Sequence, residues 1–162
     1  MRRFEKISFE RFAKDIKNDK ELYGTYKMPV RKTKRSAGYD FFAIEDISIK
    51  PGEIVKVPTG IKANFAADET LMLFVRSSMG FKWNVRMCNQ VGIIDCDYYN
   101  NTDNEGHIWV ALQNEGSKDY IIEKGTAYAQ GIFINYLTCN DEVSVVRSGG
   151  IGSTNRKSEK NG

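Results

Sequence analysis

Histidine is almost absent from this chain of 162 residues, which contains only His107. Catalysis by Ser-His-Asp or Cys-His pairs needs a histidine beside the nucleophile, and multi-histidine metal sites need several. The composition therefore nearly excludes these chemistries. Any catalysis must depend on carboxylates, basic side chains, hydroxyls and backbone dipoles, and we expect His107 to be structural.

Cysteines and long apolar runs are also scarce. The three cysteines, Cys88, Cys96 and Cys139, are odd in number and their spacing fits no zinc pattern, which favours reduced thiols in a cytosolic protein. The segment Met1–Lys6 carries basic residues without a long apolar segment behind it, so neither a signal peptide nor a membrane span is expected. These features predict a cytoplasmic protein that does not act at a membrane.

The net charge of +3 is small, and the basic residues are spread along the chain. This is too weak a charge to indicate a nucleic-acid binder, but it suits a surface that attracts a small polyanion. The basic stretch 31–35 is expected to be a solvated connection.

The hydrophobic pattern predicts an all-β protein. Residues Ser8–Asp19 are the one clear helix candidate, with Ser8 as N-cap, and short runs separated by Gly and Pro turns favour a sandwich, jelly roll or closed barrel. The expected organisation is one β domain over residues 1–148, including the helical extension at about 8–19, and a flexible glycine-rich arm over 149–162. The expected strands are Asp40–Ile44, Ile47–Ile49, Glu53–Val57, Ile61–Phe65, Leu71–Val75, Val85–Cys88, Ile108–Gln113, Tyr120–Ile122, Ala127–Tyr136 and Val143–Arg147.

Several polar groups stand out from this strand background. Arg76 precedes two hydroxyls, Ser77 and Ser78, and this combination suits phosphate oxygens. Asp95 follows an apolar run, so it is expected to lie partly out of water and to be able to deprotonate a water molecule as a general base. An extended strand would place Asp97 on the same side. Taken alone, each of these groups is also compatible with an ordinary turn or a surface ion pair.

The arm Gly149–Thr154 follows Arg147 and contains small residues that let backbone N–H groups approach an anion. Composition alone favours a disordered terminus. A mobile, phosphate-binding arm is also typical of a lid that orders over a ligand and excludes water.

These stretches, in this order, resemble the trimeric dUTPase family from about Ala37 to Thr154. The resemblance is carried by Ala37–Asp40, Arg76–Ser78, Gly92–Tyr98, Gly125–Gln130 and Gly149–Thr154. It implies a distorted jelly-roll or β-clip-like barrel with a short N-terminal helix and a flexible C-terminal tail. It also implies a homotrimer whose subunits share each active site, and hydrolysis of dUTP to dUMP and pyrophosphate with Mg²⁺ as cofactor.

The resemblance also implies roles for individual residues. Asp95 would activate the water that attacks the α-phosphate, and Asp40 would help place Mg²⁺ through water. A β-hairpin would read the uracil edge, Tyr98 would pack on the deoxyribose and exclude a 2′-hydroxyl, and Ile151 would cover the ring where the family usually has Phe. Arg147 lies one residue closer to the Gly-Gly pair than the usual arginine. The expected substrate-binding residues are Arg76, Ser77, Ser78, Asn89, Gly92, Ile93, Ile94, Tyr98, Gln130, Arg147, Ile151, Gly152 and Ser153.

Two alternatives remain open. The related dCTP deaminase family shares the fold, but its catalytic glutamate aligns with Ala111, and no carboxylate occurs in 108–114. A dUTP-responsive regulator that binds a protein partner could use the N-terminal helix and the Asn/Asp-rich segment 99–104, which is otherwise expected to be a solvated loop. Measured turnover of dUTP separates the regulator from the enzyme.

Overall fold

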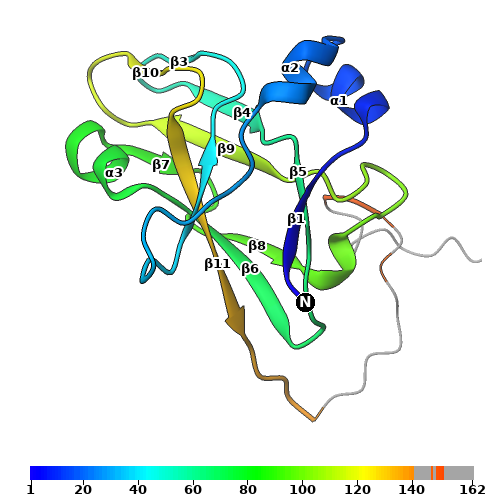
Figure 1. The fold of residues 1–162 in the computed structure, drawn as a ribbon. Coiled ribbons are helices and arrows are strands. Elements are labelled where there is room, and N and C mark those ends of the chain that lie inside the picture. The colour runs from blue at the N-terminus through cyan, green and yellow to red at the C-terminus, as the bar shows by residue number, and fades with distance from the viewer. Residues whose placement is uncertain (141–146, 148, 152–162) are drawn as a thin grey trace, which may run out of the picture.

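Antiparallel β-sheets make up most of the regular secondary structure in this computed structural model, which describes residues 1–140, 147 and 149–151 (Figure 1). The larger sheet has the strand order β2-β11-β6-β8, the second has the order β4-β9-β7, and two further pairs are β1-β5 and β3-β10. The strands are β1 (Arg3–Lys6), β2 (Tyr39–Phe42), β3 (Ile47–Ile49), β4 (Ile54–Pro58), β5 (Ile61–Asn64), β6 (Glu69–Val75), β7 (Val85–Met87), β8 (Gly92–Asp95), β9 (Trp109–Asn114), β10 (Tyr120–Ile122) and β11 (Ala127–Asn135). Nine of the ten expected strands are therefore confirmed, with limits shifted by up to two residues, whereas most of the tenth, residues 143–147, lies outside the described residues.

One hydrophobic core is shared by both larger sheets. Leu71 and Leu73 of β6 are buried on one side, and Val110 and Leu112 of β9 are buried on the other. The alternation of buried and half-buried residues along β6 and β9 is the period-two pattern of strands with one face in the core. Each fully buried side chain of this size contributes about 1.5–3 kcal/mol to folding, so the two sheets hold each other in place.

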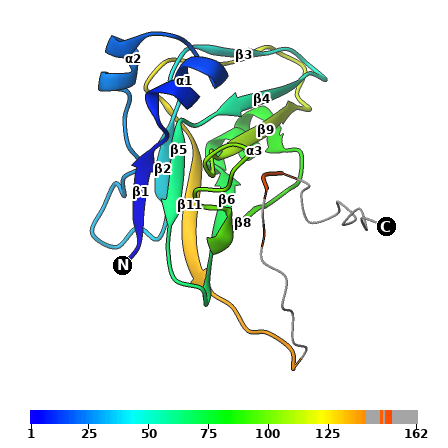
Figure 2. The ribbon, with the colours of Figure 1, turned by 90° about the vertical axis from the view of Figure 1, so that its right-hand side faces the viewer.

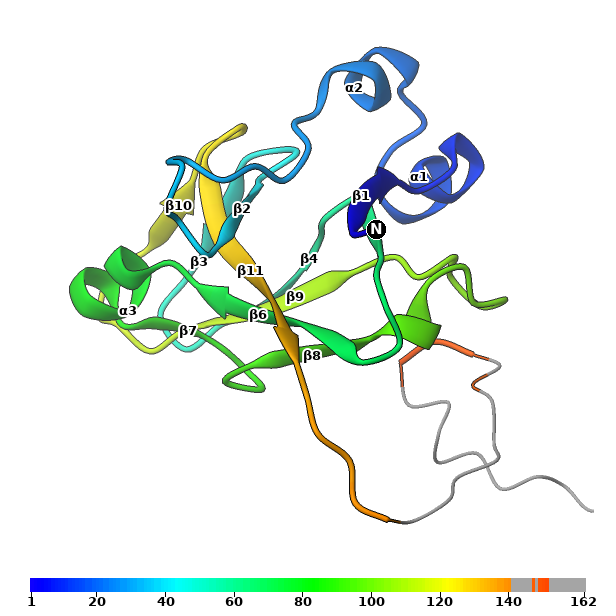
Figure 3. The same cartoon turned by 60° about the horizontal axis from the view of Figure 1, so that its bottom comes forward.

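The N-terminal extension differs from the single expected helix. Helix α1 (Phe9–Asp15) begins at Ser8, whose side chain accepts a hydrogen bond from the Arg11 N–H at 3.1 Å, as expected. However, α1 ends at Asp15, and a second helix, α2 (Lys20–Thr25), begins after it (Figures 1 and 3). Asp19 separates the two because its side chain caps α2, accepting the Leu22 N–H at 2.9 Å.

Two further short elements were not expected. Helix α3 (Ser77–Trp83) begins directly after Arg76, and a 3-10 helix, η1 (Cys96–Tyr98), follows β8. Asp97 therefore lies in a helical turn and not in an extended strand. In the part of the chain that the structure describes, no helix is long and apolar enough to cross a membrane.

Candidate active site

The expected site residues form two groups, whose main charged residues, Asp95 and Arg76, lie at opposite ends of strand β6. Asp95 on β8 is paired with Thr70, near the start of β6, whereas Arg76 follows the last residue of β6, Val75. Arg76 is six positions after Thr70 along the strand, which corresponds to about 20 Å at roughly 3.3 Å per residue. The structure therefore forms two separate pockets, which we call the Arg76 pocket and the Asp95 pocket, and they share no lining residue.

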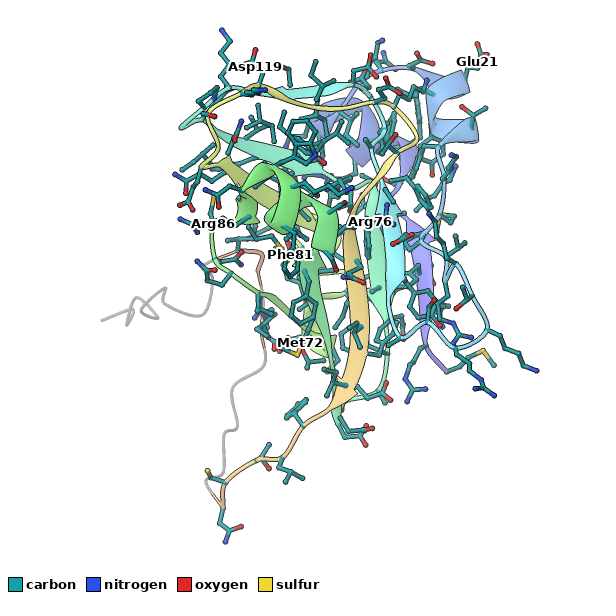
Figure 4. The ribbon with its side chains drawn as sticks, turned by 90° about the vertical axis from the view of Figure 1, so that its left-hand side faces the viewer. Glu21, Met72, Arg76, Phe81, Arg86 and Asp119 are labelled. Atoms are coloured by element: carbon teal, nitrogen blue, oxygen red, sulfur yellow. The ribbon has the colours of Figure 1, made fainter. Side chains whose placement is uncertain are left out.

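The Arg76 pocket is assembled by the register of three adjacent strands. Gln130 on β11 is paired with Asp40 on β2, and its neighbour Ala129 is paired with Val75 on β6. These pairings place Asp40, Gln130 and Arg76 side by side, with the Arg76 Nε 3.6 Å from the Asp40 Oδ1. Figure 4 shows Arg76 where α3 begins, beside β11. The lining residues are Lys32, Ser36, Ala37, Gly38, Asp40, Arg76, Ser77, Ser78, Gln130 and Ile132.

Gly38 is required for this arrangement. A Cβ atom at Gly38 would lie 2.6 Å from the Gln130 Oε1, so only glycine lets the Gln130 side chain lie against this segment. The Gln130 Nε2 donates to the Val75 carbonyl at 3.3 Å, which fixes the side chain on the pocket wall. Ser77 and Ser78 are exposed, and their hydroxyls are accessible to a ligand.

The charges of the Arg76 pocket favour an anion. Its lining has two cationic side chains, Lys32 and Arg76, and one carboxylate, Asp40. Lys32 was not among the expected site residues because the stretch 31–35 was interpreted as a solvated connection. The feature that could have indicated Lys32 is its position in the sequence, because the basic stretch lies a few residues before Asp40 and leads into the pocket.

The Asp95 pocket collects most of the remaining expected residues. Its lining residues are Leu73, Asn89, Gly92, Ile93, Ile94, Asp95, Tyr98, Ile108, Trp109, Arg147 and Ile151. Gly92 is buried, and a Cβ there would lie 3.1 Å from the Leu73 Cβ, so glycine allows β8 to approach β6 closely. Trp109 is a lining residue that sequence reasoning did not identify.

The expected β-hairpin around Asn89 is not formed. Strand β7 pairs with β9 and strand β8 pairs with β6, so the two strands that flank Asn89 belong to different sheets. A turn joins them, in which the Gln90 N–H donates to the Met87 carbonyl at 3.1 Å and Gln90 has a φ of 62°. Asn89 and strand β8 still line the Asp95 pocket. The turn that carries Asn89 connects two sheets and does not close a hairpin.

Arg147 pairs with both carboxylates of this region. Its Nη2 lies 2.8 Å from the Asp95 Oδ2, its Nε lies 3.1 Å from the Asp97 Oδ1, and its guanidinium lies 5.6 Å from the centre of the Tyr98 ring. The Asp95 side chain is 53 % exposed. About half of the Asp95 side chain therefore faces water in a single chain, and Arg147 lies against the rest of its carboxylate.

Tyr98 is buried and fixed by its hydroxyl. The hydroxyl donates to the His107 carbonyl at 3.0 Å and accepts from the Asn104 Nδ2 at 2.7 Å. Burial raises the pKa of Tyr98, so the hydroxyl stays a neutral donor near pH 7. Segment 99–104 is thus not simply a solvated loop: Asn101 is buried and hydrogen-bonded.

The start of the C-terminal arm lies against the same region. The Gly150 N–H donates to the Asp103 Oδ2 at 2.9 Å, and Ile151, although 78 % exposed, lines the Asp95 pocket. Figures 2 and 3 show this segment close to the end of β8. The expected arm residues Gly152 and Ser153 lie outside the described residues.

The described residues offer no preformed cluster of ligands for a divalent cation. Among residues 1–140, 147 and 149–151, no three His, Cys, Asp or Glu side chains are grouped as metal ligands. The Asp40 Oδ2 is buried and has no hydrogen-bond partner in this part of the chain, so it can accept a hydrogen bond from a water molecule that a cation holds. These residues fit Mg²⁺ bound mainly through phosphates and water, which is how Mg²⁺ usually binds.

Comparison with known proteins identifies the family of the chain. A sequence model of the dUTPase family matches residues 25–161. The deoxyuridine 5′-triphosphate nucleotidohydrolase of Lactococcus lactis subsp. lactis is 44 % identical over 130 residues, which cover 78 % of this chain and 87 % of that protein.

Solved structures agree with the sequence comparison. The crystal structure of dUTPase from Streptococcus mutans is 39 % identical, has a TM-score of 0.70, and covers 85 % of this chain and 98 % of the other. This likeness confirms the jelly-roll-like β fold. A variant dUTPase from phage phi11 of S. aureus, described with a structural Mg(II) ion, is 19 % identical with a TM-score of 0.65 over 90 % of this chain and 97 % of the other, and it supports the fold alone.

Proposed function

The chain belongs to the dUTPase family, and from this premise we infer that it hydrolyses dUTP to dUMP and pyrophosphate. The observation that carries the inference is the pair of complementary pockets on one chain. One gathers an arginine, a lysine and two hydroxyls around a carboxylate, as a triphosphate requires. The other places Asp95 beside exposed backbone and a buried tyrosine, as a nucleoside requires. The strand Trp109–Asn114 carries no carboxylate, which leaves the deaminase alternative without its catalytic group.

In the proposed mechanism, Asp95 takes a proton from the water that attacks the α-phosphorus. The Ser77 and Ser78 hydroxyls donate to phosphate oxygens, the Gln130 amide contributes a donor, and Arg76 balances the charge that develops on the leaving pyrophosphate. The backbone of Gly92, Ile93 and Ile94, with the Asn89 side chain, reads the uracil edge, and Tyr98 packs on the deoxyribose.

Arg147 exchanges partners when the nucleotide binds. In the single chain it neutralises Asp95 and Asp97. The triphosphate is a stronger anion, so we assign Arg147 to the phosphates in the complex. There it leaves Asp95 free to accept a proton. Ile151, Gly152 and Ser153 of the arm then cover the nucleotide and exclude water.

Bound Mg²⁺ would neutralise charge on the triphosphate and orient its phosphates. Asp40 is the residue that would hold it, through the hydrogen-bond capacity of its buried Oδ2. The Arg76 guanidinium beside Asp40 limits the negative charge available there. The carboxylate is therefore suited to accept hydrogen bonds from metal-bound water.

The separation of the two pockets supports a shared active site in a homotrimer. Asp95 and Arg76 lie about 20 Å apart along β6. An arginine side chain cannot close that gap within one chain. A neighbouring subunit that places its Arg76 pocket against the Asp95 pocket completes the site, and rotational symmetry makes three such sites from three chains.

The first experiment measures pyrophosphate release from dUTP, dTTP, UTP and dCTP side by side. We expect rapid release from dUTP alone. Asp95→Asn should lower kcat by about 10²–10⁴-fold, the usual worth of a general base. Asp97→Asn is the matched control, because Asp97 contacts the same arginine and is not assigned to the water. An equal fall in both variants would contradict the role of Asp95, equal activity on dTTP would contradict the uracil contacts, and no turnover of any nucleotide would favour the regulator.

The second experiment tests the shared site by mixing two inactive variants, Arg76→Ala and Asp95→Asn, after joint refolding. If each site takes one pocket from each of two subunits, random mixing at equal amounts restores about a quarter of the sites. If both pockets serve one site within a chain, the mixture stays inactive. Each variant refolded alone is the control, and an inactive mixture with normal trimers would reject the shared site.

A further inference from the structure

Among the described residues, the side chains of the N-terminal extension make most of their long-range hydrogen bonds with one segment, residues 99–107. The Ser8 Oγ donates to the Glu105 Oε1 at 2.6 Å, the Arg11 Nη1 donates to the Asp103 carbonyl at 3.0 Å, and the Asp15 Oδ2 lies 2.6 Å from the His107 Nδ1. Figure 1 shows this segment running beneath α1. Residues 1–24 precede the region that the family model matches. The extension therefore pairs with β5 through β1 and binds segment 99–107 through its side chains.

Segment 99–107 in turn wraps around Tyr98. The Asn101 Nδ2 donates to the Tyr98 carbonyl at 2.8 Å, and the Asn104 Nδ2 donates to the Tyr98 hydroxyl at 2.7 Å. Gly106 has a φ of 79°, and a Cβ there would lie 2.7 Å from the Tyr98 carbonyl oxygen, so the backbone closes tightly on this residue.

Asn104 can hold the hydroxyl because its own orientation is fixed. Its Oδ1 accepts from the Asn101 Nδ2 at 2.8 Å and from the Gly106 N–H at 3.1 Å, which directs its Nδ2 toward Tyr98. The Tyr98 hydroxyl also donates to the His107 carbonyl at 3.0 Å. The His107 ring is held between Asp15 and the Gly60 N–H, whose distance to Nε2 is 2.9 Å.

We propose that residues 5–15 and 99–107 form a brace that fixes the Tyr98 ring and thereby sets the preference for deoxyribose over ribose. The proposal rests on the proposed function, in which Tyr98 packs on the sugar. A soft pocket rejects an added hydroxyl weakly, whereas a wall that cannot move rejects it strongly. Asn104 is the positioning residue that acts directly on Tyr98, and Ser8, Arg11 and Asp15 act through segment 99–107.

The test compares kcat/KM for dUTP and UTP in the full-length enzyme. Asn104→Ala should reduce the dUTP/UTP ratio about tenfold, mainly by raising activity on UTP, because the released ring can move away from a 2′-hydroxyl. Tyr98→Phe removes the hydroxyl that the brace holds and should reduce the ratio similarly. If both act through one hydrogen bond, the double variant reduces the ratio no further than either single variant.

One variant serves as a control, and a second extends the test to the N-terminal extension. Ile122→Val removes a methyl group from the buried β3–β10 pair, far along the chain from the brace, and should leave the ratio unchanged at similar loss of stability. Ser8→Ala breaks the contact with Glu105 without touching Tyr98, and should lower the ratio by a smaller factor. If Asn104→Ala does not fold, Ser8→Ala and Tyr98→Phe together test the brace: an unchanged dUTP/UTP ratio in both would reject it.

The outcomes separate this proposal from the proposed function. A wild-type enzyme that uses dUTP and UTP equally would reject the assignment of Tyr98 to the sugar. A wild-type enzyme that discriminates, with the ratio unchanged in Asn104→Ala and Tyr98→Phe, would reject the brace alone. Additive losses in the double variant would also reject it, since the two residues would then act independently.

Discussion

The stability of the fold should fall when the pH drops below about 6.5, the usual pKa of histidine. The effect can be assigned to one residue because the chain has a single histidine, His107. His107 is fully buried, with its Nδ1 2.6 Å from the Asp15 Oδ2 and its Nε2 accepting the Gly60 N–H at 2.9 Å. This pattern requires the neutral ring with its proton on Nδ1. A second proton would turn Nε2 into a donor that faces another donor. Burial lowers the pKa of His107, and the contact with Asp15 only partly opposes this.

The sign and size of the effect follow from proton linkage. The unfolded chain binds a proton at His107 near pH 6.5, whereas the folded chain binds it only at lower pH, so the unfolded state holds more protons in between. The stabilisation is complete above the unfolded pKa and is lost as the pH falls toward the folded pKa. The free energy of unfolding should therefore decrease by up to about 1.4 kcal/mol per pH unit in this window.

Asp15 contributes in a separate, more acidic window. Burial raises its pKa, but the hydrogen bonds from Arg11 and His107 outweigh burial, and the net shift is downward. The stabilisation from Asp15 is present above its unfolded pKa, near 3.9, and is lost below it. The change between pH 6.5 and pH 5 therefore reports His107.

The measurement is urea unfolding at pH 7.5, 6.5 and 5.5, at one fixed protein concentration because oligomers gain stability by mass action. His107→Gln should be less stable at pH 7.5, yet nearly independent of pH over this range, since no other histidine remains. The reasoning fails if His107→Gln keeps the wild-type slope. It also fails if the wild type becomes more stable on acidification, which would mean a charged His107 paired with Asp15.

Three further substitutions test individual contacts. Tyr128→Phe should stabilise the fold by about 1–3 kcal/mol in urea unfolding, because the buried Tyr128 hydroxyl has no hydrogen-bond partner among the described residues, and a loss of stability would reveal a partner. Gly38→Ala should raise the KM for dUTP without unfolding the protein, because the new Cβ pushes the flexible Gln130 side chain out of the Arg76 pocket. An unchanged KM would show that Gln130 is not needed for binding. Lys32→Gln should raise the KM about two- to fivefold, the worth of an exposed ion pair, whereas Lys34→Gln, outside the pocket lining, should not; equal effects would indicate general charge attraction.

Short-range patterns were sufficient for most of the strands and for the first helix cap. The limits of β3 and β10 agree with the expected ranges, and Ser8 caps α1 as expected. Strand β1 was missed because Arg3–Lys6 has only one apolar residue, Phe4, and becomes a strand by pairing with β5. Helix α3 was missed because its seven residues include Gly80 and bury only Met79, so no helical stripe is visible.

Local sequence indicated candidate site residues, but it could not show how they are grouped. Asp40, Gln130 and Arg76 lie far apart along the chain, and only the pairing of β2, β11 and β6 brings them together. The same limitation explains the missing hairpin, since the turn around Asn89 does not reveal that its flanking strands pair in different sheets.

The exposure of Asp95 in a single chain is a consequence of where β6 places the two pockets. In the single chain an Asp95 oxygen is occupied by the Arg147 guanidinium, so this oxygen is not available to the attacking water. A neighbouring Arg76 pocket that brings phosphates to Asp95 would change both conditions, by excluding water and by giving Arg147 a stronger anion to bind. In the proposed trimer, the burial that general-base catalysis needs would therefore come from the assembled site. Activity should consequently depend on subunit association even where each chain is fully folded.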